Sequence, residues 1–191
     1  ERAKVGITIE MLPWARAYNQ ALKESDTCVF TTTRTPEREA LFKWVGPVGS
    51  SDWALYGNAE RKLKLGSIED ARPMIIGTYL GDARDEYFRS RGFKVESVSD
   101  DLSNPRKLLL NRIDLWAASV VRGSMLVAQN DWTGKVVPLL VFHKVDLYMA
   151  CHVDLPTALI DRLNAALQTM VRDGTTKAIE KKYAHWPLPP S

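Results

Sequence analysis

Short apolar runs alternate with amphipathic stretches along most of the chain, which predicts a regular succession of strands and helices. Strands are expected in several short apolar segments, at 28–33, 53–56, 74–79, 93–98, 113–121, 136–142 and 146–151. Helices are expected where proline or helical periodicity marks a start, after Pro13, at 105–112, after Pro156 and at 175–183. The proline-rich end at 187–190 is read as a tail. This alternation is typical of α/β proteins with largely parallel sheets.

Two further elements are predicted near the start of the chain. Val5, Ile7 and Ile9 alternate with other residues and predict a strand that ends near Met11. After the strand at 28–33, Thr35 is expected to cap a helix that carries Pro36 in its first turn and runs through Arg38. Gly46-Pro47 and 49–51 are read as breaks between extended segments.

The stretch 33–38 suggests a site for a small anion. Threonine amides and hydroxyls at a strand end, followed by a guanidinium on a helix, suit a carboxylate ligand. The alternative is an ordinary strand-to-helix junction in which Arg34 and Arg38 are solvated or paired with Glu37 and Glu39. Spacing alone favours that alternative. In open α/β sheets ligands bind at the carboxyl ends of strands, and three ends are candidates here, 31–33, 79–82 and 117–119.

Composition and charge exclude some classes. The chain has 191 residues, 45% of them hydrophobic, which allows one domain or two small ones. The net charge of +3 is dispersed, so nucleic-acid binding is not suggested, and no apolar run approaches the roughly 20 residues of a membrane span. Cys28 and Cys151 could form a bridge, but two buried thiols are favoured. The chain begins at Glu1 without a visible signal peptide, which suggests a cleaved or truncated start.

An enzyme is not indicated. The three histidines, His143, His152 and His185, are scattered, and the sequence has no metal-ligand spacing, nucleophile elbow or phosphate-binding loop. We therefore expect no catalytic residue, no metal and no cofactor.

Several motifs occur in an order that resembles the family-three extracellular solute-binding proteins, the periplasmic receptors for polar amino acids that serve ABC importers. The matching segments are 12–17, 34–39, 42–47, 67–70, 76–77, 111–114, 147–150, the helix from Pro156 and 173–179. The resemblance implies a periplasmic binding protein type II fold, with two α/β lobes joined by two crossover strands. It implies lobe 1 from residues 1–73 plus 143–191 and lobe 2 from 74–142. Members usually open with a strand and helix that have no counterpart here, so lobe 1 is expected to be truncated at its N-terminus.

The resemblance also implies ligand-binding residues. Arg38 matches the arginine that holds the ligand α-carboxylate, and Thr33 and Thr31 match positions that meet the ligand from the strand end. Gly81, Asp82 and Ala83 match a helix start whose amides meet the carboxylate, although the family often has Ser or Thr in place of Asp82. A fixed anion there would oppose a carboxylate unless Asp82 caps its own helix.

Three more residues complete the candidate site. Ser119 lies where amino-acid binders commonly place an aspartate for the ligand ammonium group. Trp53 and Trp116 lie near the presumed cleft, and ligand contact and core packing are about equally expected for them. Trp14 and Trp44 are expected in the core.

The implied function is that of a substrate-binding protein, which closes on an amino acid or related carboxylate for an ABC importer. Its expected partners are this small-molecule ligand and the ABC transporter permease, and we expect a periplasmic monomer that binds no nucleic acid. Two alternatives remain: a ligand-sensing input domain of a membrane signalling protein, and a remnant of the fold that no longer binds ligand.

Overall fold

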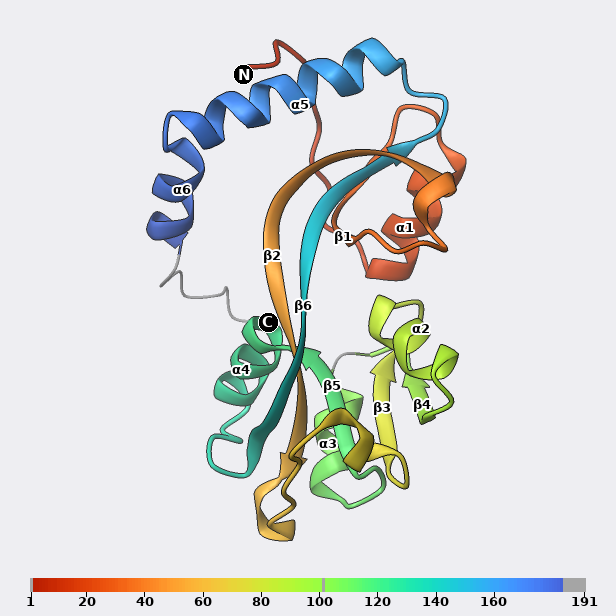
Figure 1. The fold of residues 1–191 in the computed structure, drawn as a ribbon, viewed down its shortest axis with the longest axis vertical. Helices are drawn as coiled ribbons and strands as arrows, with labels where there is room; N and C mark the ends of the chain where they lie inside the picture. Colours follow the sequence, from red (N-terminus) through yellow and green to blue (C-terminus); the bar gives the residue numbers. More distant parts are fainter. Residues whose placement is uncertain (1, 101, 184–191) are drawn as a thin grey trace. The chain divides into compact units, whose positions relative to one another are not determined.

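The computed structural model describes residues 2–100 and 102–183, so His185 and the proline-rich end at 187–190 lie outside the described residues. Helices and strands alternate along the chain (Figure 1). The strands are β1 (Cys28–Thr33), β2 (Phe42–Asn58), β3 (Ile75–Tyr79), β4 (Lys94–Val98), β5 (Leu115–Ser119) and β6 (Val136–His152). The α-helices are α1 (Trp14–Lys23), α2 (Ala83–Ser90), α3 (Ser103–Leu109), α4 (Val120–Gln129), α5 (Thr157–Arg172) and α6 (Thr175–Tyr183). Short 3₁₀ turns lie at Glu39–Leu41, Ala59–Arg61 and Ile68–Ala71.

The chain divides into two compact units. Unit 1 comprises Glu1–Gly49 and Asp146–Ser191, and unit 2 comprises Ser50–Val145. The 17-residue strands β2 and β6 each contain a boundary between the units, so each strand passes from one unit to the other. The strand order is β1-β6-β2-β5-β3-β4. This arrangement confirms the predicted α/β fold with two lobes joined by two long strands. The units differ in their bounds from the expected lobes, since residues 50–73 and 143–145, which the prediction placed in lobe 1, lie in unit 2.

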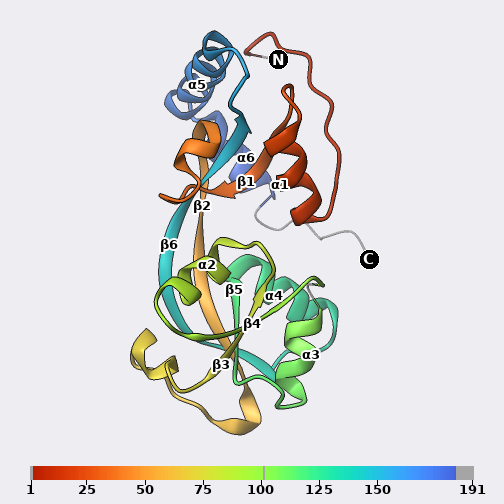
Figure 2. The same ribbon diagram turned by 90° about the vertical axis from the view of Figure 1, so that its right-hand side faces the viewer.

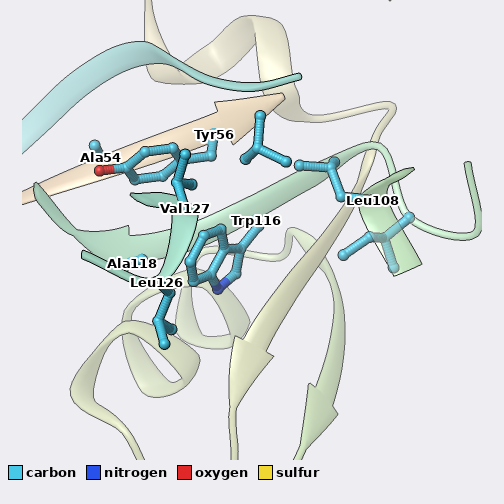
Figure 3. Packing of buried hydrophobic residues seen from close by; sticks show 9 residues of the cluster. Ala54, Tyr56, Leu108, Trp116, Ala118, Leu126 and Val127 are labelled. Atoms are coloured by element: carbon cyan, nitrogen blue, oxygen red, sulfur yellow. The ribbon is translucent and has the colours of Figure 1, made fainter. Parts of the chain in front are cut away.

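In unit 2, alternate strand residues face two separate hydrophobic clusters, as the period of two in a strand requires. Ala54, Tyr56 and Trp116 point to the face covered by α3 and α4, where they meet Leu108 and Leu126 (Figure 3). The neighbouring strand residues point to the other face and pack under α2, in a cluster that includes Leu55, Ala117, Ile76, Phe88 and Phe93. Figure 2 shows α2 and α3 on different sides of the strands. Unit 2 is therefore a three-layer α/β unit.

In unit 1, helices likewise cover both faces of the strands. Ala21 of α1 packs with Val29, Phe42 and Ala150 on one face. Ile160 of α5 packs on the other face, in a cluster with Val45, Cys151 and Leu155. The predicted helices after Pro13 and Pro156 are confirmed, because each proline immediately precedes the first residue of its helix.

The prediction of two free thiols was wrong. Cys28 and Cys151 occupy opposite positions in the antiparallel pair β1–β6 and form a disulfide with an S–S distance of 2.10 Å. The sequence separation of 123 residues gave no indication of this pairing, since only the register of β1 against β6 brings the two residues together.

Two predictions near the start of the chain were also wrong. The structure has no strand over 5–11, and Ile7 and Ile9 are exposed, because alternation alone does not supply the neighbouring strand that a ladder of hydrogen bonds needs. The helix expected through Arg38 is a turn followed by the 3₁₀ turn Glu39–Leu41. Since β2 begins at Phe42, the chain has room for only one turn there.

Later in the chain, two boundaries differ from the prediction. Strand β2 runs without interruption through 46–51, where breaks were expected. A Cβ atom on Gly46 would lie 2.6 Å from the Tyr148 ring, so this glycine permits close packing rather than a turn. The strand expected to reach Val121 ends at Ser119, and α4 begins at once. Val120 and Val121 favour a strand by propensity, but the Ser119 cap starts a helix at this point.

Among the described residues, no helix combines the length and the apolar character needed to cross a membrane.

Candidate functional site

Five of the predicted site residues lie at one edge of the unit 2 sheet. Strands β3 and β5 are parallel neighbours, so their carboxyl ends reach the same edge. Gly81, Asp82 and Ala83 follow β3, and Ser119 is the last residue of β5. Trp53 lies opposite Ser119 in the antiparallel pair β2–β5. Two strand-to-helix junctions and one tryptophan therefore share this edge.

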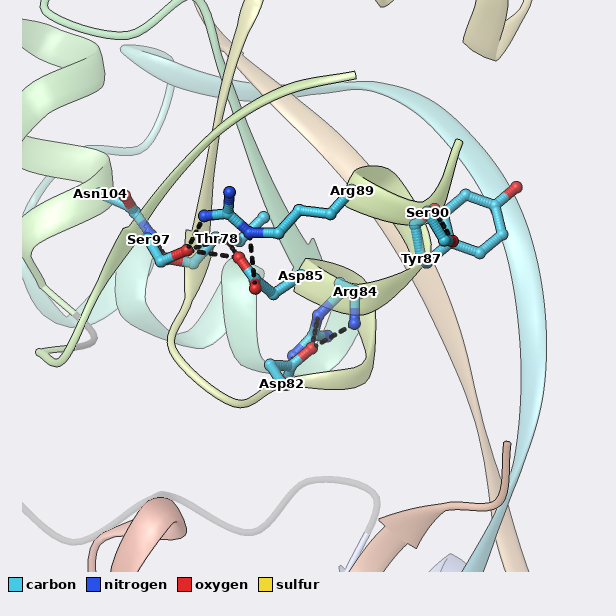
Figure 4. Close-up of polar contacts among 9 residues, drawn as sticks. All are labelled: Thr78, Asp82, Arg84, Asp85, Tyr87, Arg89, Ser90, Ser97 and Asn104. Carbon is cyan, nitrogen blue, oxygen red and sulfur yellow. Dashed lines mark hydrogen bonds and ion pairs between the residues drawn. The ribbon is translucent and has the colours of Figure 1, made fainter. Parts of the chain in front are cut away.

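Asp82 caps its own helix, as the prediction allowed. Its Oδ1 atom accepts a hydrogen bond of 2.8 Å from the Arg84 backbone amide at the start of α2 (Figure 4). The Arg84 guanidinium donates to the same carboxylate, from Nε at 2.8 Å and from Nη2 at 2.7 Å. Gly81 precedes this cap with φ of +73°, a conformation that glycine adopts without a steric penalty. The junction is therefore held by an internal ion pair.

A second polar cluster anchors α2 to the sheet. The buried Asp85 carboxylate accepts hydrogen bonds from Thr78 at 2.5 Å, from Ser97, and from Arg89 Nε at 3.0 Å (Figure 4). Asn104 donates to the Thr78 carbonyl at 2.8 Å and joins α3 to the same strand. Burial tends to raise the pKa of Asp85, but the hydrogen bonds from Ser97, Thr78 and Arg89 outweigh it and lower this pKa below its ordinary value. The carboxylate therefore stays ionised near neutral pH and fixes α2 in place.

Ser119 also caps a helix, since its hydroxyl oxygen accepts a hydrogen bond of 3.1 Å from the Arg122 amide at the start of α4. The two tryptophans differ in their surroundings. Trp53 is 4% exposed, and its ring lies 5.2 Å from the His143 ring and 5.8 Å from the Arg84 guanidinium, measured to ring centroids. Trp116 belongs to the cluster under α3 and α4, with its centroid 5.1 Å from that of Tyr56. Trp116 therefore has the environment of a core residue.

Arg84 is the residue of this edge that sequence reasoning missed. It joins Asp82 to Trp53 through an ion pair on one side and a ring contact on the other. The signal was its position two residues after an expected N-cap aspartate, where both its amide and its guanidinium can return to that carboxylate.

The other predicted site residues belong to unit 1. Thr31 is exposed and Thr33 is half-buried on β1, with Thr33 opposite Leu147 of β6. Thr32 between them is fully buried, and its hydroxyl donates to the Val29 carbonyl at 3.3 Å beside an irregularity in the strand register. Thr31 and Thr33 are therefore accessible to solvent, fully or in part, while Thr32 faces inward.

The two arginines of the 33–38 stretch have different environments. Arg34 forms an ion pair with Glu39 and lies 5.5 Å from the Trp44 ring and 5.4 Å from the Tyr148 ring. The hydrogen bond to Glu39 raises the pKa of Arg34. The alternative prediction, that Arg34 pairs with a neighbouring glutamate, is therefore confirmed. Arg38 is only 2% exposed, with its guanidinium 5.1 Å from the centre of the Tyr18 ring of α1, so it is not a solvated surface residue.

Within the described ranges, 2–100 and 102–183, no group of three or more His, Cys, Asp or Glu residues could hold a metal ion.

The fold defines a class: the chain has a periplasmic binding protein type II fold, shared with many solved structures. The sequence itself matches no protein-family model and no curated protein. A histidine kinase sensor domain with similarity to periplasmic binding proteins has a TM-score of 0.81 at 16% identity, covering 91% of this chain and 76% of that one. An ancestral arginine-binding protein bound to glutamine has a TM-score of 0.80 at 20% identity, covering 95% and 81%.

A third solved structure, the GluR0 ligand-binding core from Nostoc punctiforme in complex with (L)-glutamate, has a TM-score of 0.77 at 17% identity and covers 95% of this chain and 84% of that one. At these identities the likeness establishes the fold alone.

Proposed function

We propose that this chain is a substrate-binding protein that captures a small polar solute, an amino acid or a related carboxylate, for an ABC importer. The observation that carries the proposal is the convergence of the β3–α2 and β5–α4 junctions at one edge of the unit 2 sheet. In open α/β sheets such an edge is where ligands bind. The predicted site residues there are Gly81, Asp82, Ala83 and Ser119, of which Asp82 and Ser119 have polar side chains, with Trp53 opposite Ser119.

Within unit 1, Arg38 is proposed as an anion contact. Arg38 carries a guanidinium that is buried against Tyr18, and a desolvated guanidinium binds a carboxylate more strongly than a solvated one does. Thr31 and Thr33 on β1 add hydroxyl and backbone groups on the strand that leads to Arg38. Trp116 is proposed as a support for the sheet edge rather than as a ligand contact, because it packs in the core.

The proposed compartment is the periplasm. A disulfide between Cys28 and Cys151 is favoured in an oxidising compartment and disfavoured in the cytosol. The proposed partners are the solute and the ABC transporter permease, with the chain acting as a monomer and without a cofactor. We propose a binding role and no catalytic one.

A second candidate is a ligand-sensing input domain of a membrane signalling protein. It is favoured by the likeness to a histidine kinase sensor domain, at a TM-score of 0.81. Both candidate functions require ligand binding. They differ in the partner that responds to the ligand-bound protein, which is a permease in one case and a signalling domain in the other. The genomic neighbourhood separates them: a permease encoded next to this chain supports import, and a kinase or cyclase domain on the same polypeptide supports sensing.

The proposal is tested by thermal unfolding of the chain with each of the twenty amino acids and a set of organic acids. A ligand at a hundredfold excess over its Kd stabilises the folded state by about 2.7 kcal/mol, which is a readily measured shift in Tm. A shift with one or a few of these compounds supports the proposal. No shift with any of them contradicts it and favours a remnant of the fold that no longer binds ligand.

A further inference from the structure

The buried guanidinium of Arg38 lies over an aromatic ring that packs against two further rings. The ring belongs to Tyr18 of α1, and its centre is 5.1 Å from the guanidinium carbon. The Tyr18 ring also contacts Trp14, with centroids 5.6 Å apart, and meets Phe42 edge to face, with centroids 5.3 Å apart. Trp14 and Tyr18 share a face of α1, and Phe42 is buried in the cluster under that helix. The packing of α1 on the sheet therefore sets the position of the Tyr18 ring.

The backbone of Arg38 is held in a short turn. Its amide donates to the Thr35 carbonyl at 3.1 Å, and its carbonyl accepts from the Leu41 amide at 3.0 Å. The turn fixes where the side chain starts, but an arginine side chain has several rotatable bonds beyond that point. The contact with Tyr18 restricts its charged end. All of these contacts lie within unit 1, so this unit alone defines the geometry of Arg38.

An aromatic ring acts on a guanidinium differently from a carboxylate. The face of a ring attracts a cation through its quadrupole but carries no net negative charge, so the contact with Tyr18 holds the Arg38 guanidinium without neutralising it. Arg34 of the same stretch, in contrast, forms an ion pair with Glu39. A guanidinium that is already oriented loses less side-chain freedom when it binds a carboxylate. A ring at position 18 therefore raises the affinity of Arg38 for an anion without contacting the anion.

We propose that Tyr18 is a positioning residue for ligand binding, whose ring holds the Arg38 guanidinium in the orientation that receives the ligand carboxylate. This inference rests on the proposed function, and within it on the assignment of the carboxylate to Arg38. The proposed role requires an aromatic ring at position 18 but not the phenolic hydroxyl. A substitution that keeps the ring should therefore preserve binding, and one that keeps only the apolar character should not.

Calorimetric titration of Tyr18→Phe and Tyr18→Leu tests the inference. The probes are those of the twenty amino acids and the organic acids that raise the Tm of the wild-type chain. We expect Tyr18→Leu to bind them about tenfold more weakly than the wild type and Tyr18→Phe to stay within about threefold. Tyr148→Leu is the matched control, because Tyr148 is also a tyrosine of unit 1 whose ring centre lies 5.4 Å from an arginine, Arg34. The control should bind as the wild type does, and thermal unfolding establishes that each variant is folded.

A double-mutant cycle with Arg38→Ala separates positioning from a general effect on packing. If Tyr18 acts through Arg38, Tyr18→Leu should not weaken binding further in the Arg38→Ala background, whereas a packing defect weakens binding in both backgrounds. The NMR resonance of the Arg38 Nε–H group, assigned by its absence in Arg38→Ala, provides a readout without ligand. The ring current of residue 18 shifts this resonance, so it should move in Tyr18→Leu and stay near its wild-type position in Tyr18→Phe.

Wild-type affinity in a folded Tyr18→Leu variant overturns the inference and leaves the proposed function in place. Equal weakening of binding by Tyr18→Leu in both backgrounds does the same, as does equal weakening by Tyr18→Phe and Tyr18→Leu. An Arg38 resonance that does not move in Tyr18→Leu contradicts the contact on which the inference depends. Failure of every amino acid and organic acid to bind the wild type overturns the proposed function together with the inference, so the two failures are distinguishable.

Discussion

The Cys28 and Cys151 sulfurs are bonded across opposite positions of the antiparallel strands β1 and β6, which joins the first segment of unit 1 to its second. Both residues pack in the cluster under α5, where Cys151 is fully buried. The bond therefore crosslinks two parts of one unit that are 123 residues apart in the sequence.

Removal of this bond should destabilise the chain. A crosslink over so long a loop restricts the unfolded state, and loss of such a native disulfide typically costs about 2–5 kcal/mol. We expect the double variant Cys28→Ala/Cys151→Ala to unfold at a lower urea concentration than the oxidised wild type. Treatment of the wild type with a reductant under unfolding conditions should lower its midpoint similarly, while the double variant should not respond. Equal midpoints for the oxidised wild type and the double variant would contradict the prediction.

Gly123 on α4 allows this helix to approach the sheet. A Cβ atom there would lie 2.5 Å from Cζ of Tyr56, a buried ring whose hydroxyl donates to the Val120 carbonyl at 3.1 Å. In Gly123→Ala we expect overpacking to cost about 1–3 kcal/mol against roughly 1 kcal/mol gained in helix propensity, which leaves a net loss of up to about 2 kcal/mol. Gly49→Ala is the control, since a Cβ at Gly49 meets no atom within 4 Å. Chemical denaturation of both variants measures the difference, and equal stability of the two would count against this packing.

The lowered pKa of Asp85 predicts that the free energy of unfolding depends on pH. Because the folded-state pKa of Asp85 is lowered, its ionised form contributes stability that is present above the unfolded pKa of about 3.9 and is lost as the pH falls through the folded pKa. We expect Asp85→Asn to reduce the free energy of unfolding near pH 7 by about 2 kcal/mol, since hydrogen bonds to a charged group are lost. The difference from the wild type should shrink below about pH 4.

Urea unfolding at a series of pH values measures this difference. Glu69→Gln serves as the control, because Glu69 pairs with Arg72 in an exposed ion pair and should change stability by less than about 1 kcal/mol. A difference between Asp85→Asn and the wild type that stays constant from pH 7 to pH 3 would rule out the proposed role of the Asp85 carboxylate.

The sequence predicted most elements of the fold because their signals are local. Pro13 and Pro156 each precede a helix, and Ser67 forms a capping box with Asp70 three residues later. The features that were missed depend on contacts between distant segments. The disulfide follows from the register of β1 against β6, and the continuity of β2 through Gly46 follows from the Tyr148 ring. Neither contact has a local signature.

The same distinction between local signals and contacts of distant segments applies to the candidate site. The Asp82 cap was foreseen because it depends on residues next to it in the sequence. The burial of Arg38 against Tyr18 and the placement of Trp116 in the core were not determined, since each depends on how a helix packs on the sheet. Arg84 was overlooked although its signal was local.

The measurement that tests the proposed binding most directly is calorimetric titration of wild type and Arg38→Ala with the compound that gives the largest thermal shift. Truncation of a desolvated arginine–carboxylate contact typically costs about 2–5 kcal/mol, so the variant should bind at least thirtyfold more weakly. Arg16→Ala, which removes an exposed arginine from α1 of the same unit, should bind as the wild type does. If a folded Arg38→Ala variant retains wild-type affinity, the assignment of the ligand carboxylate to Arg38 is wrong.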